Sequence, residues 1–257
     1  MSNWFFLPPE LFEKNTFFVP QELHRHFRAL RLKKGDDMVL SDGKSRTFAA
    51  RLESISSKKA EVSILEELEL ETEPPQEIIL FPAVLKGEKM EIIIRQGVEL
   101  GACRIVPVLT ERTIVRMEQY KIANRKERWQ QIALSAASQC RRTRIPQIDS
   151  PLQFEDTLEL LQGMELTIVP WENEMNTSLL TLLQKYVVPS SLAIFSGPEG
   201  GITPAEIEKL KEIKNLYPVS LGPRVLRAET APLAVLSAVM CFWGHKGVDC
   251  SVLAGGD

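Results

Sequence analysis

The chain has 257 residues, of which 44% are hydrophobic and 25% charged, with a formal net charge of −3. This composition is ordinary for a soluble globular protein, and the length allows one large domain or a small and a medium one. The N-terminus has no basic segment before an apolar run, and the longest nearly apolar stretch, 231–244, is too short to span a bilayer, so we expect a cytoplasmic protein.

The first seventy residues predict a small β-rich module. Short alternating runs surround "SDGKS", which is typical of a hairpin turn, and "QELHRHFRALRLKKGD" predicts a short amphipathic helix that carries Arg25, Arg28 and Arg31. His24 and His26 lack an evident carboxylate partner, which favours packing or surface histidines. The segment "ELETEPPQE" is typical of a linker, because paired prolines resist both helix and buried strand. We therefore predict domains over 1–72 and 73–257.

The second domain alternates strand and helix patterns. In chain order they are "EIILFPAVL", "MEIIIRQGVELG", "RIVPVLT", "RKERWQQIALSAASQC", "ELTIVPW", "TSLLTLLQKY", "SLAIFSG", "PAEIEKLKEI", "YPVSLG" and "APLAVLSAVMCFWG". This β-α alternation predicts an α/β fold with a mostly parallel sheet covered on both faces.

Charge is distributed unevenly along the chain. Residues 111–146 contain nine basic and three acidic residues, while 51–77 contain three basic and eight acidic residues. The basic segment predicts a face for a polyanion, although solvated helix faces produce the same pattern. Five of its arginines and one lysine lie beside or within the helix pattern there and are candidates for phosphate contacts: Arg125, Lys126, Arg128, Arg141, Arg142 and Arg144.

Cysteine and histidine spacing predicts neither a disulfide nor a metal site. The four cysteines, Cys103, Cys140, Cys241 and Cys250, form no CxxC pair, and the three histidines do not cluster with them.

The stretch "SLAIFSGPEGGITPAEIEKL" places a glycine loop at the carboxyl end of a buried strand. Thr203 and Glu206, with Pro204 between them, predict a capping box at the start of the next helix. The ends of strands in α/β sheets are ligand sites. No phosphate-loop pattern is present and Glu199 would repel a phosphate, which favours a neutral or cationic ligand with an adenine or ribose, such as S-adenosylmethionine. A tight turn without ligand is the alternative.

A second segment, "VSLGPRVLRAETAPLAVLSA", repeats the strand-to-helix pattern with Arg224 and Arg227 in its loop. Two arginines flanked by apolar residues indicate an anion or a carboxylate partner, for which Glu199 and Glu229 are candidates.

Together the two segments resemble the SPOUT-class 16S rRNA (uracil-N3)-methyltransferases, the RsmE family, in which a GPEGG loop precedes an L-G-x-R-x-L-R-x-E-T-A segment. The resemblance extends over most of the chain, through "KGEKMEIIIRQGVELGACRIVPV", "RWQQIALSAASQCRRTRIPQI" and "HRHFRALRLKKGD". His24-Arg25-His26 and Gln139-Cys140 depart from the family pattern.

The resemblance implies a C-terminal trefoil knot that cradles S-adenosylmethionine, an N-terminal PUA-like β-barrel that binds RNA, and a homodimer that acts on 16S rRNA or the small ribosomal subunit. Arg224, Arg227 and Glu229 would serve the reaction. Glu229 could instead satisfy backbone donors at the helix start. The expected cofactor residues are Gly197, Pro198, Glu199, Gly200, Gly201, Leu221, Gly222 and Leu226.

Two alternatives remain open at this point. A different RNA acceptor, such as a tRNA base or a 2′-hydroxyl, would keep the glycine loop. A binding or assembly factor would keep the fold without turnover.

Overall fold

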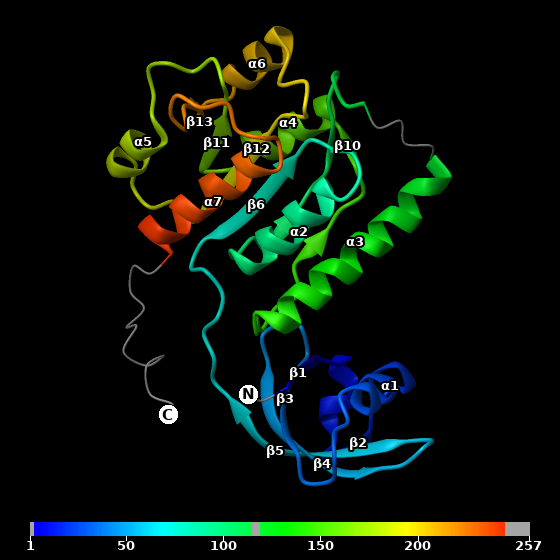
Figure 1. Cartoon of the computed structure of the whole chain (residues 1–257). Helices are drawn as coiled ribbons and strands as arrows, with labels where there is room; N and C mark the ends of the chain where they lie inside the picture. The colour runs from blue at the N-terminus through cyan, green and yellow to red at the C-terminus, as the bar shows by residue number, and fades with distance from the viewer. Residues whose placement is uncertain (1–2, 115–118, 245–257) are drawn as a thin grey trace. The chain divides into compact units, whose positions relative to one another are not determined.

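The computed structural model describes residues 3–114 and 119–244 in two units (Figure 1). Unit 1 comprises Met1–Glu73 with Ala137–Ile145, and unit 2 comprises Pro74–Ala136 with Pro146–Asp257. Arg116 of the basic segment, the third histidine, His245, and Cys250 lie outside the described residues. Within the described ranges no helix combines the length and the apolar character that crossing a membrane requires.

Unit 1 contains a five-stranded sheet in the order β1-β3-β4-β5-β2, in which β1 pairs with β3 in parallel and the other neighbours are antiparallel. Its elements are β1 (Asn3–Phe6), the 3-10 helix η1 (Pro9–Glu13), β2 (Thr16–Phe18), α1 (Gln21–Ala29), β3 (Asp37–Ser41), β4 (Thr47–Ile55) and β5 (Ala60–Leu68).

The predicted hairpin turn joins β3 to β4. Asp42 Oδ1 accepts hydrogen bonds from the backbone N–H groups of Lys44, Ser45 and Arg46, and Gly43 has a φ of 70° that favours glycine. The prediction of a turn at this position is confirmed.

The helix α1 packs Phe27 into the core of unit 1, where this side chain is fully buried. His24 is also buried, and its Nε2 lies 3.0 Å from the carbonyl oxygen of Ser56. It is therefore a packing histidine. The helix ends before Arg31, whose φ of 57° lies in the left-handed region.

The segment Ala137–Ile145 belongs to unit 1 because its polar groups are satisfied there. Ser138 Oγ donates to the carbonyl oxygen of Trp4 at 2.5 Å, and Ser41 Oγ donates to that of Thr143 at 3.0 Å. Glu73 accepts from the Arg142 guanidinium, with Nε at 3.0 Å, and from the N–H of Thr143 at 3.2 Å. Unit 1 is therefore built from two stretches of chain, whereas the sequence predicted a single boundary at 72.

Unit 2 is built on a six-stranded parallel sheet in the order β13-β11-β12-β6-β7-β9, so the predicted parallel α/β sheet is confirmed. Its strands are β6 (Glu77–Pro82), β7 (Arg104–Ile105), β9 (Gln147–Ile148), β11 (Leu166–Pro170), β12 (Ser191–Ser196) and β13 (Leu216–Val219), and β8 (Val108–Leu109) pairs separately with β10 (Leu152–Gln153). Its helices are α2 (Lys89–Glu99), α3 (Gln119–Gln139), α4 (Phe154–Gln162), α5 (Leu179–Lys185), α6 (Pro204–Lys211) and α7 (Thr230–Trp243), of which α3 continues into the part of the chain assigned to unit 1.

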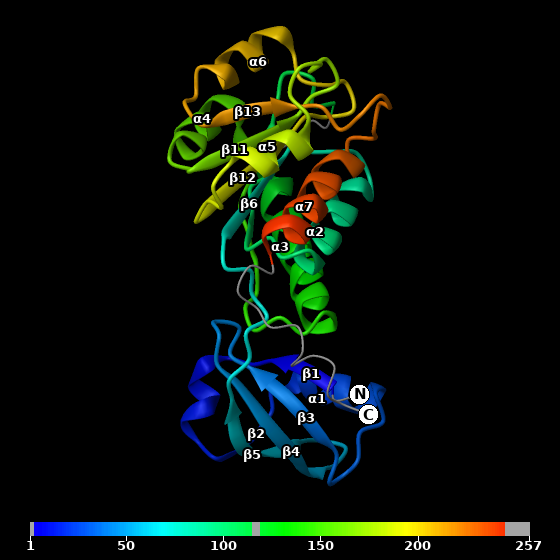
Figure 2. The same cartoon turned by 90° about the vertical axis from the view of Figure 1, so that its left-hand side faces the viewer.

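Helices cover both faces of this sheet, with α4 and α6 on one face and α2 and α7 on the other (Figure 2). Successive strand residues point to opposite faces. In β12, Ala193 and Phe195 therefore pack with Phe154 of α4 and Ile207 of α6. On the other face the absence of a Cβ at Gly97 lets α2 approach Leu80 of β6 closely. Burial on both faces explains why these strands are continuously apolar.

After the edge strand β13 the chain returns to the middle of the sheet. Ser220 forms an isolated parallel bridge with Ser178, just before α5, and α7 then packs against β11, β12, α2 and α5. The segment 220–229 thus lies at the carboxyl ends of β11 and β12, where it faces the glycine loop.

Candidate active site

The glycine loop, 197–202, is fixed by the start of α6. Thr203 Oγ1 accepts from the N–H of Glu206 at 3.2 Å, and the Glu206 carboxylate accepts from the N–H of Thr203 at 2.9 Å. The predicted capping box is confirmed. The second oxygen of Glu206 accepts from the N–H of Glu111 at 2.9 Å, so this buried carboxylate also holds the segment after β8.

Two glycines of the loop leave no room for a side chain. A Cβ at Gly197 would lie 2.7 Å from Cγ1 and 3.2 Å from the backbone nitrogen of Ile202. Gly201 has a φ of 73°, and its Cβ would lie 2.7 Å from Oε1 of Glu172. Gly200 is held from outside, because the Arg112 guanidinium donates to its carbonyl oxygen at 2.8 Å. The loop therefore presents bare backbone in a fixed path.

The second segment, 220–229, is held by the connection between β11 and α5. The N–H of Ser220 donates to Thr177 at 2.8 Å, and the N–H of Leu179 donates to Ser220 at 3.1 Å. Gly222 follows with a φ of 101°, which favours glycine. Beyond it, Arg224 and Val225 are exposed, while Leu226 is half-buried.

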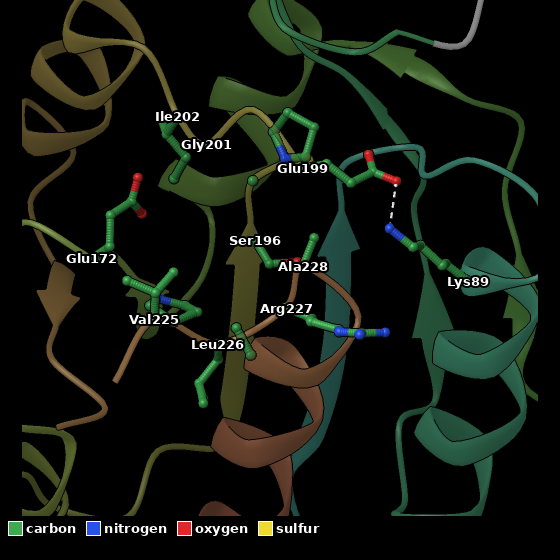
Figure 3. A pocket seen from close by; sticks show the side chains of 14 residues that line it. Lys89, Glu172, Ser196, Glu199, Gly201, Ile202, Val225, Leu226, Arg227 and Ala228 are labelled. Atoms are coloured by element: carbon green, nitrogen blue, oxygen red, sulfur yellow. Dashed lines mark hydrogen bonds and ion pairs between the residues drawn. The ribbon is translucent and has the colours of Figure 1, made fainter. Parts of the chain in front are cut away.

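The two segments enclose a cavity of about 280 Å³, which we call the reaction cavity (Figure 3). Figure 3 shows the glycine loop on one side, Val225, Leu226 and Arg227 on another, and Lys89 approaching from α2. Of the residues predicted to bind a cofactor, five line it: Gly197, Pro198, Glu199, Gly201 and Leu226. Leu221 and Gly222 line an adjoining hollow of about 280 Å³ with Arg224, and Gly200 lines neither.

Glu199 lies at the rim of the reaction cavity, where Lys89 holds it. Lys89 Nζ is 3.1 Å from Glu199 Oε1, which also accepts from the N–H of Lys86 at 3.3 Å. Burial works to raise the pKa of Glu199, but the hydrogen bonds from its own N–H, from the Lys89 ammonium and from the Lys86 N–H hold that pKa below its usual value. The cavity therefore carries a fixed negative charge beside the glycine loop.

Glu229 is buried at the start of α7. The helix begins with no side-chain hydrogen bond from Glu229, so the expectation that this carboxylate satisfies backbone donors is wrong. Oε2 of Glu229 lies 3.9 Å from Lys89 Nζ, and Oε1 lies 3.9 Å from the Arg227 guanidinium. Oε2 has no hydrogen-bond partner within the described structure. A buried carboxylate oxygen without a hydrogen bond is costly, which makes Glu229 a candidate for a ligand contact.

Lys89 lines the reaction cavity and was missed by sequence reasoning. Its ammonium contacts carboxylates on both segments, Glu199 and Glu229, which otherwise repel each other. A lysine in the first turn of a helix opposes the helix dipole, and this was the available signal that it has a partner elsewhere. Glu172, which lines both hollows, and Arg112 were missed too, because neither belongs to a recognisable motif.

The two predicted catalytic arginines differ in position. The Arg227 side chain is 83% exposed and lines the reaction cavity, whereas Arg224 lines the adjoining hollow. Of the expected carboxylate pairs, Arg227 approaches Glu229, at the long distance of 3.9 Å. Arg227 thus remains available to a ligand.

The predicted RNA contacts fall in both units. In unit 1, Arg25 and Arg28 are exposed on α1, and Arg31, Arg141 and Arg144 are exposed beyond helix ends. In unit 2, Arg125 and Arg128 lie on α3, where Arg128 pairs with Glu91 of α2 at 2.6 Å.

The prediction that Arg142 contacts RNA is wrong. Its side chain is 5% exposed and its guanidinium is paired with Glu73, so it holds the second stretch of unit 1 in place rather than facing a ligand. Its neighbour Arg141, with a φ of 61° at the turn that follows α3, is exposed instead.

An all-parallel sheet with a glycine loop and a returning C-terminal segment around one cavity is the fold of the SPOUT class of methyltransferases. The model of a family described as an RNA methyltransferase domain matches residues 72–240, and that of an RNA methyltransferase PUA domain matches residues 22–65. The chain belongs to the family of the ribosomal RNA small subunit methyltransferases E.

Relatives and solved structures agree with this membership. The Bacillus subtilis protein of that name is 33% identical over 88% of this chain and 90% of its own length, and the Synechocystis protein is 36% identical over 90% and 75%. The Neisseria gonorrhoeae enzyme bound to S-adenosyl methionine has a TM-score of 0.84 at 32% identity, covering 96% of this chain and 100% of that one. A Legionella pneumophila protein described as a methyltransferase, with bound cofactor SAM, has a TM-score of 0.84 at 30% identity over 94% and 98%.

Proposed function

We propose that this protein uses S-adenosylmethionine to methylate N3 of a specific uridine in the 16S rRNA of the small ribosomal subunit. The observation that carries the proposal is the fixed glycine loop, in which bare backbone at Gly197 and Gly201 lies beside the ionised Glu199. Such a wall fits a cofactor that is cationic and has no phosphate. The S-adenosylmethionine found in the N. gonorrhoeae relative has these properties.

The residues of the reaction cavity fit this cofactor. Gly197, Gly201 and Leu226 would form the wall against which adenosine packs, and the carboxylates of Glu199 and Glu172 would face its positive charge. When bound, S-adenosylmethionine supplies an electrophilic methyl group. The chain's task is then to position the acceptor and to control its charge.

The acceptor nitrogen of uridine carries a proton that must leave for its lone pair to attack. Arg227 lies at the cavity with its guanidinium largely free of the fold, and it would stabilise the negative charge that develops on the uracil oxygens. Glu229, with an oxygen that accepts no hydrogen bond in the described structure, would receive the proton. Arg224, on the adjoining hollow, would contact the RNA backbone.

RNA would be held by exposed cations in both units. We propose that residues 1–72 act as a PUA-like RNA-binding domain through Arg25, Arg28 and Arg31, and that residues 73–257 form the methyltransferase domain. Arg125, Arg128, Arg141 and Arg144 would add phosphate contacts, with salt-dependent affinity. Arg142 is excluded by its burial.

We further propose that the enzyme works as a cytoplasmic homodimer. Exposed apolar side chains near the reaction cavity support this proposal, because Met175 and Val225 are each 85% exposed. Light scattering coupled to gel filtration distinguishes a dimer from a monomer, and a monomer at micromolar concentration would contradict this part of the proposal.

The function is tested by methyl transfer from labelled S-adenosylmethionine to small subunits purified from a strain that lacks the enzyme. Nucleoside analysis of the product should show N3-methyluridine at one site. A 2′-O-methyl nucleoside, or transfer to tRNA alone, would establish a different acceptor. Cofactor binding with no transfer to any RNA would establish a binding factor instead.

A further inference from the structure

A second hollow, of about 460 Å³, lies in unit 2 between the turn before α2 and the face of α3. Its floor is apolar and consists of side chains that are at most 5% exposed: Leu85, Met90 and Trp129. Its rim is charged and consists of Lys86, Glu88, Glu91, Arg125 and Arg128. Its volume lies in the range of small-molecule sites, and we call it the α2–α3 hollow.

The charges on its rim favour an anion. Glu91 is paired with Arg128 at 2.6 Å, and since the Glu91 side chain is 17% exposed while that of Arg128 is 68% exposed, the cation faces solvent. In the part of the chain that the structure describes, no carboxylate pairs with Lys86 or Arg125. Glu88 is exposed and makes no capping hydrogen bond at the start of α2. Its carboxylate is therefore available to accept hydrogen bonds from amino groups of a ligand.

The α2–α3 hollow shares a wall with the reaction cavity. The turn 86–88 and the first residue of α2 separate them, with Lys86 on the rim of the hollow and Lys89 on the lining of the cavity. The turn is pinned from the cavity side, because Glu199 accepts from the N–H of Lys86 at 3.3 Å and from Nζ of Lys89 at 3.1 Å. A polymeric ligand with one monomer in the reaction cavity can therefore place a neighbouring monomer in the α2–α3 hollow.

We propose that the α2–α3 hollow binds a nucleotide of the RNA strand next to the target uridine, an inference that rests on the proposed function. The base lies on the apolar floor of Met90 and Trp129, with its amino groups within reach of Glu88. The phosphate is neutralised by Lys86 and Arg125. This contact fixes the register of the strand, so that one uridine rather than its neighbours enters the reaction cavity.

The first test measures RNA affinity and salt dependence for Arg125→Glu and Lys86→Glu. The matched control is Lys214→Glu, which makes the same change of charge at an exposed position outside all three hollows. We expect both hollow variants to weaken the Kd for RNA about 10-fold or more and to reduce the salt slope by about one. The Kd for S-adenosylmethionine should stay within about 2-fold of wild type, as should every constant of the control.

The second test uses an rRNA fragment that lacks the base on the 5′ or the 3′ side of the target. The affinity of the wild-type protein should fall about 10-fold for one of the two abasic fragments, because stacking of one base is removed, and should change little for the other. Hollow variants that bind RNA no worse than Lys214→Glu would overturn the proposal, and so would equal affinity for both abasic fragments and the intact one. Failure of wild type to transfer methyl groups would overturn the proposed function, while the binding measurements would still decide whether the hollow holds RNA.

Discussion

Replacing Gly197 by alanine tests whether the glycine loop must be bare backbone to hold the cofactor. The new Cβ would lie 2.7 Å from Cγ1 of Ile202 and 3.2 Å from its backbone nitrogen. Carbon atoms in contact normally lie about 3.5–4.0 Å apart, so the loop must shift by about 0.8 Å or more. The shift cannot be absorbed by rotating Ile202 alone, since one of the close atoms belongs to the backbone.

We expect this strain to cost about 1–3 kcal/mol. If it is relieved by moving the loop into the cavity, affinity for S-adenosylmethionine falls by about 5- to 150-fold. Gly200→Ala should have a smaller effect, because its Cβ would approach Cβ of Arg112 to 3.3 Å, a milder contact than the 2.7 Å at Gly197. Gly163→Ala is the neutral control, since its nearest neighbour would be 3.5 Å away and its φ is −75°.

Calorimetric titration of the three variants with S-adenosylmethionine, beside thermal unfolding, separates binding from stability. The expected order of weakening is Gly197→Ala, then Gly200→Ala, then Gly163→Ala. A Gly197→Ala protein that binds the cofactor with the wild-type Kd would refute the reasoning, because the loop would then tolerate a side chain where the structure has no space.

Three further changes follow from the contacts of single charged side chains. Lys89→Met should weaken cofactor binding and lower turnover, because the carboxylates beside it lose their shared cation, and Lys89→Arg should restore part of both in the same assays. Arg142→Ala should lower the free energy of unfolding by about 3–5 kcal/mol in urea while Arg141→Ala changes it by less than about 0.5, and equal effects would contradict the burial of one and exposure of the other. The pKa of Glu199 is lowered from its usual 4.5, so its ionised form stabilises the fold above that pH, and this stabilisation is lost as the pH falls through the lowered value. The difference in the free energy of unfolding between wild type and Glu199→Gln should therefore be constant near neutral pH and shrink below pH 4.5.

Local patterns were sufficient to predict the parts of the fold that local chemistry determines. The capping box at Thr203 and Glu206 depends on residues three apart, and the apolar run of β12 reflects burial on both faces. The helix α4 was missed although Phe154 and Leu161 recur at helical spacing and Ser150-Pro151 precedes it as a turn signal.

Contacts between distant residues could not be read from the sequence. Glu73 and Arg142 lie 69 residues apart, and Lys89 and Glu199 lie 110 apart, so neither pair leaves a local pattern. Glu229 shows a different limit. Its position at a helix start favours capping, but the fold turns its carboxylate to Lys89 and Arg227 instead. At Glu229, contacts with distant residues thus override the capping role that the local sequence predicts.

The division of unit 1 into two stretches of chain determines the order in which the protein can mature during synthesis. The hydroxyl of Ser41 and the carboxylate of Glu73 find their partners in residues 142–144, so the unit that begins the chain stays incomplete until more than half of the chain has been made. By then β6, α2 and β7 have been synthesised, but the residues that line the reaction cavity, apart from Lys89, lie between 170 and 231 and are still to come. A growing chain therefore gains its complete N-terminal unit well before it can bind a cofactor.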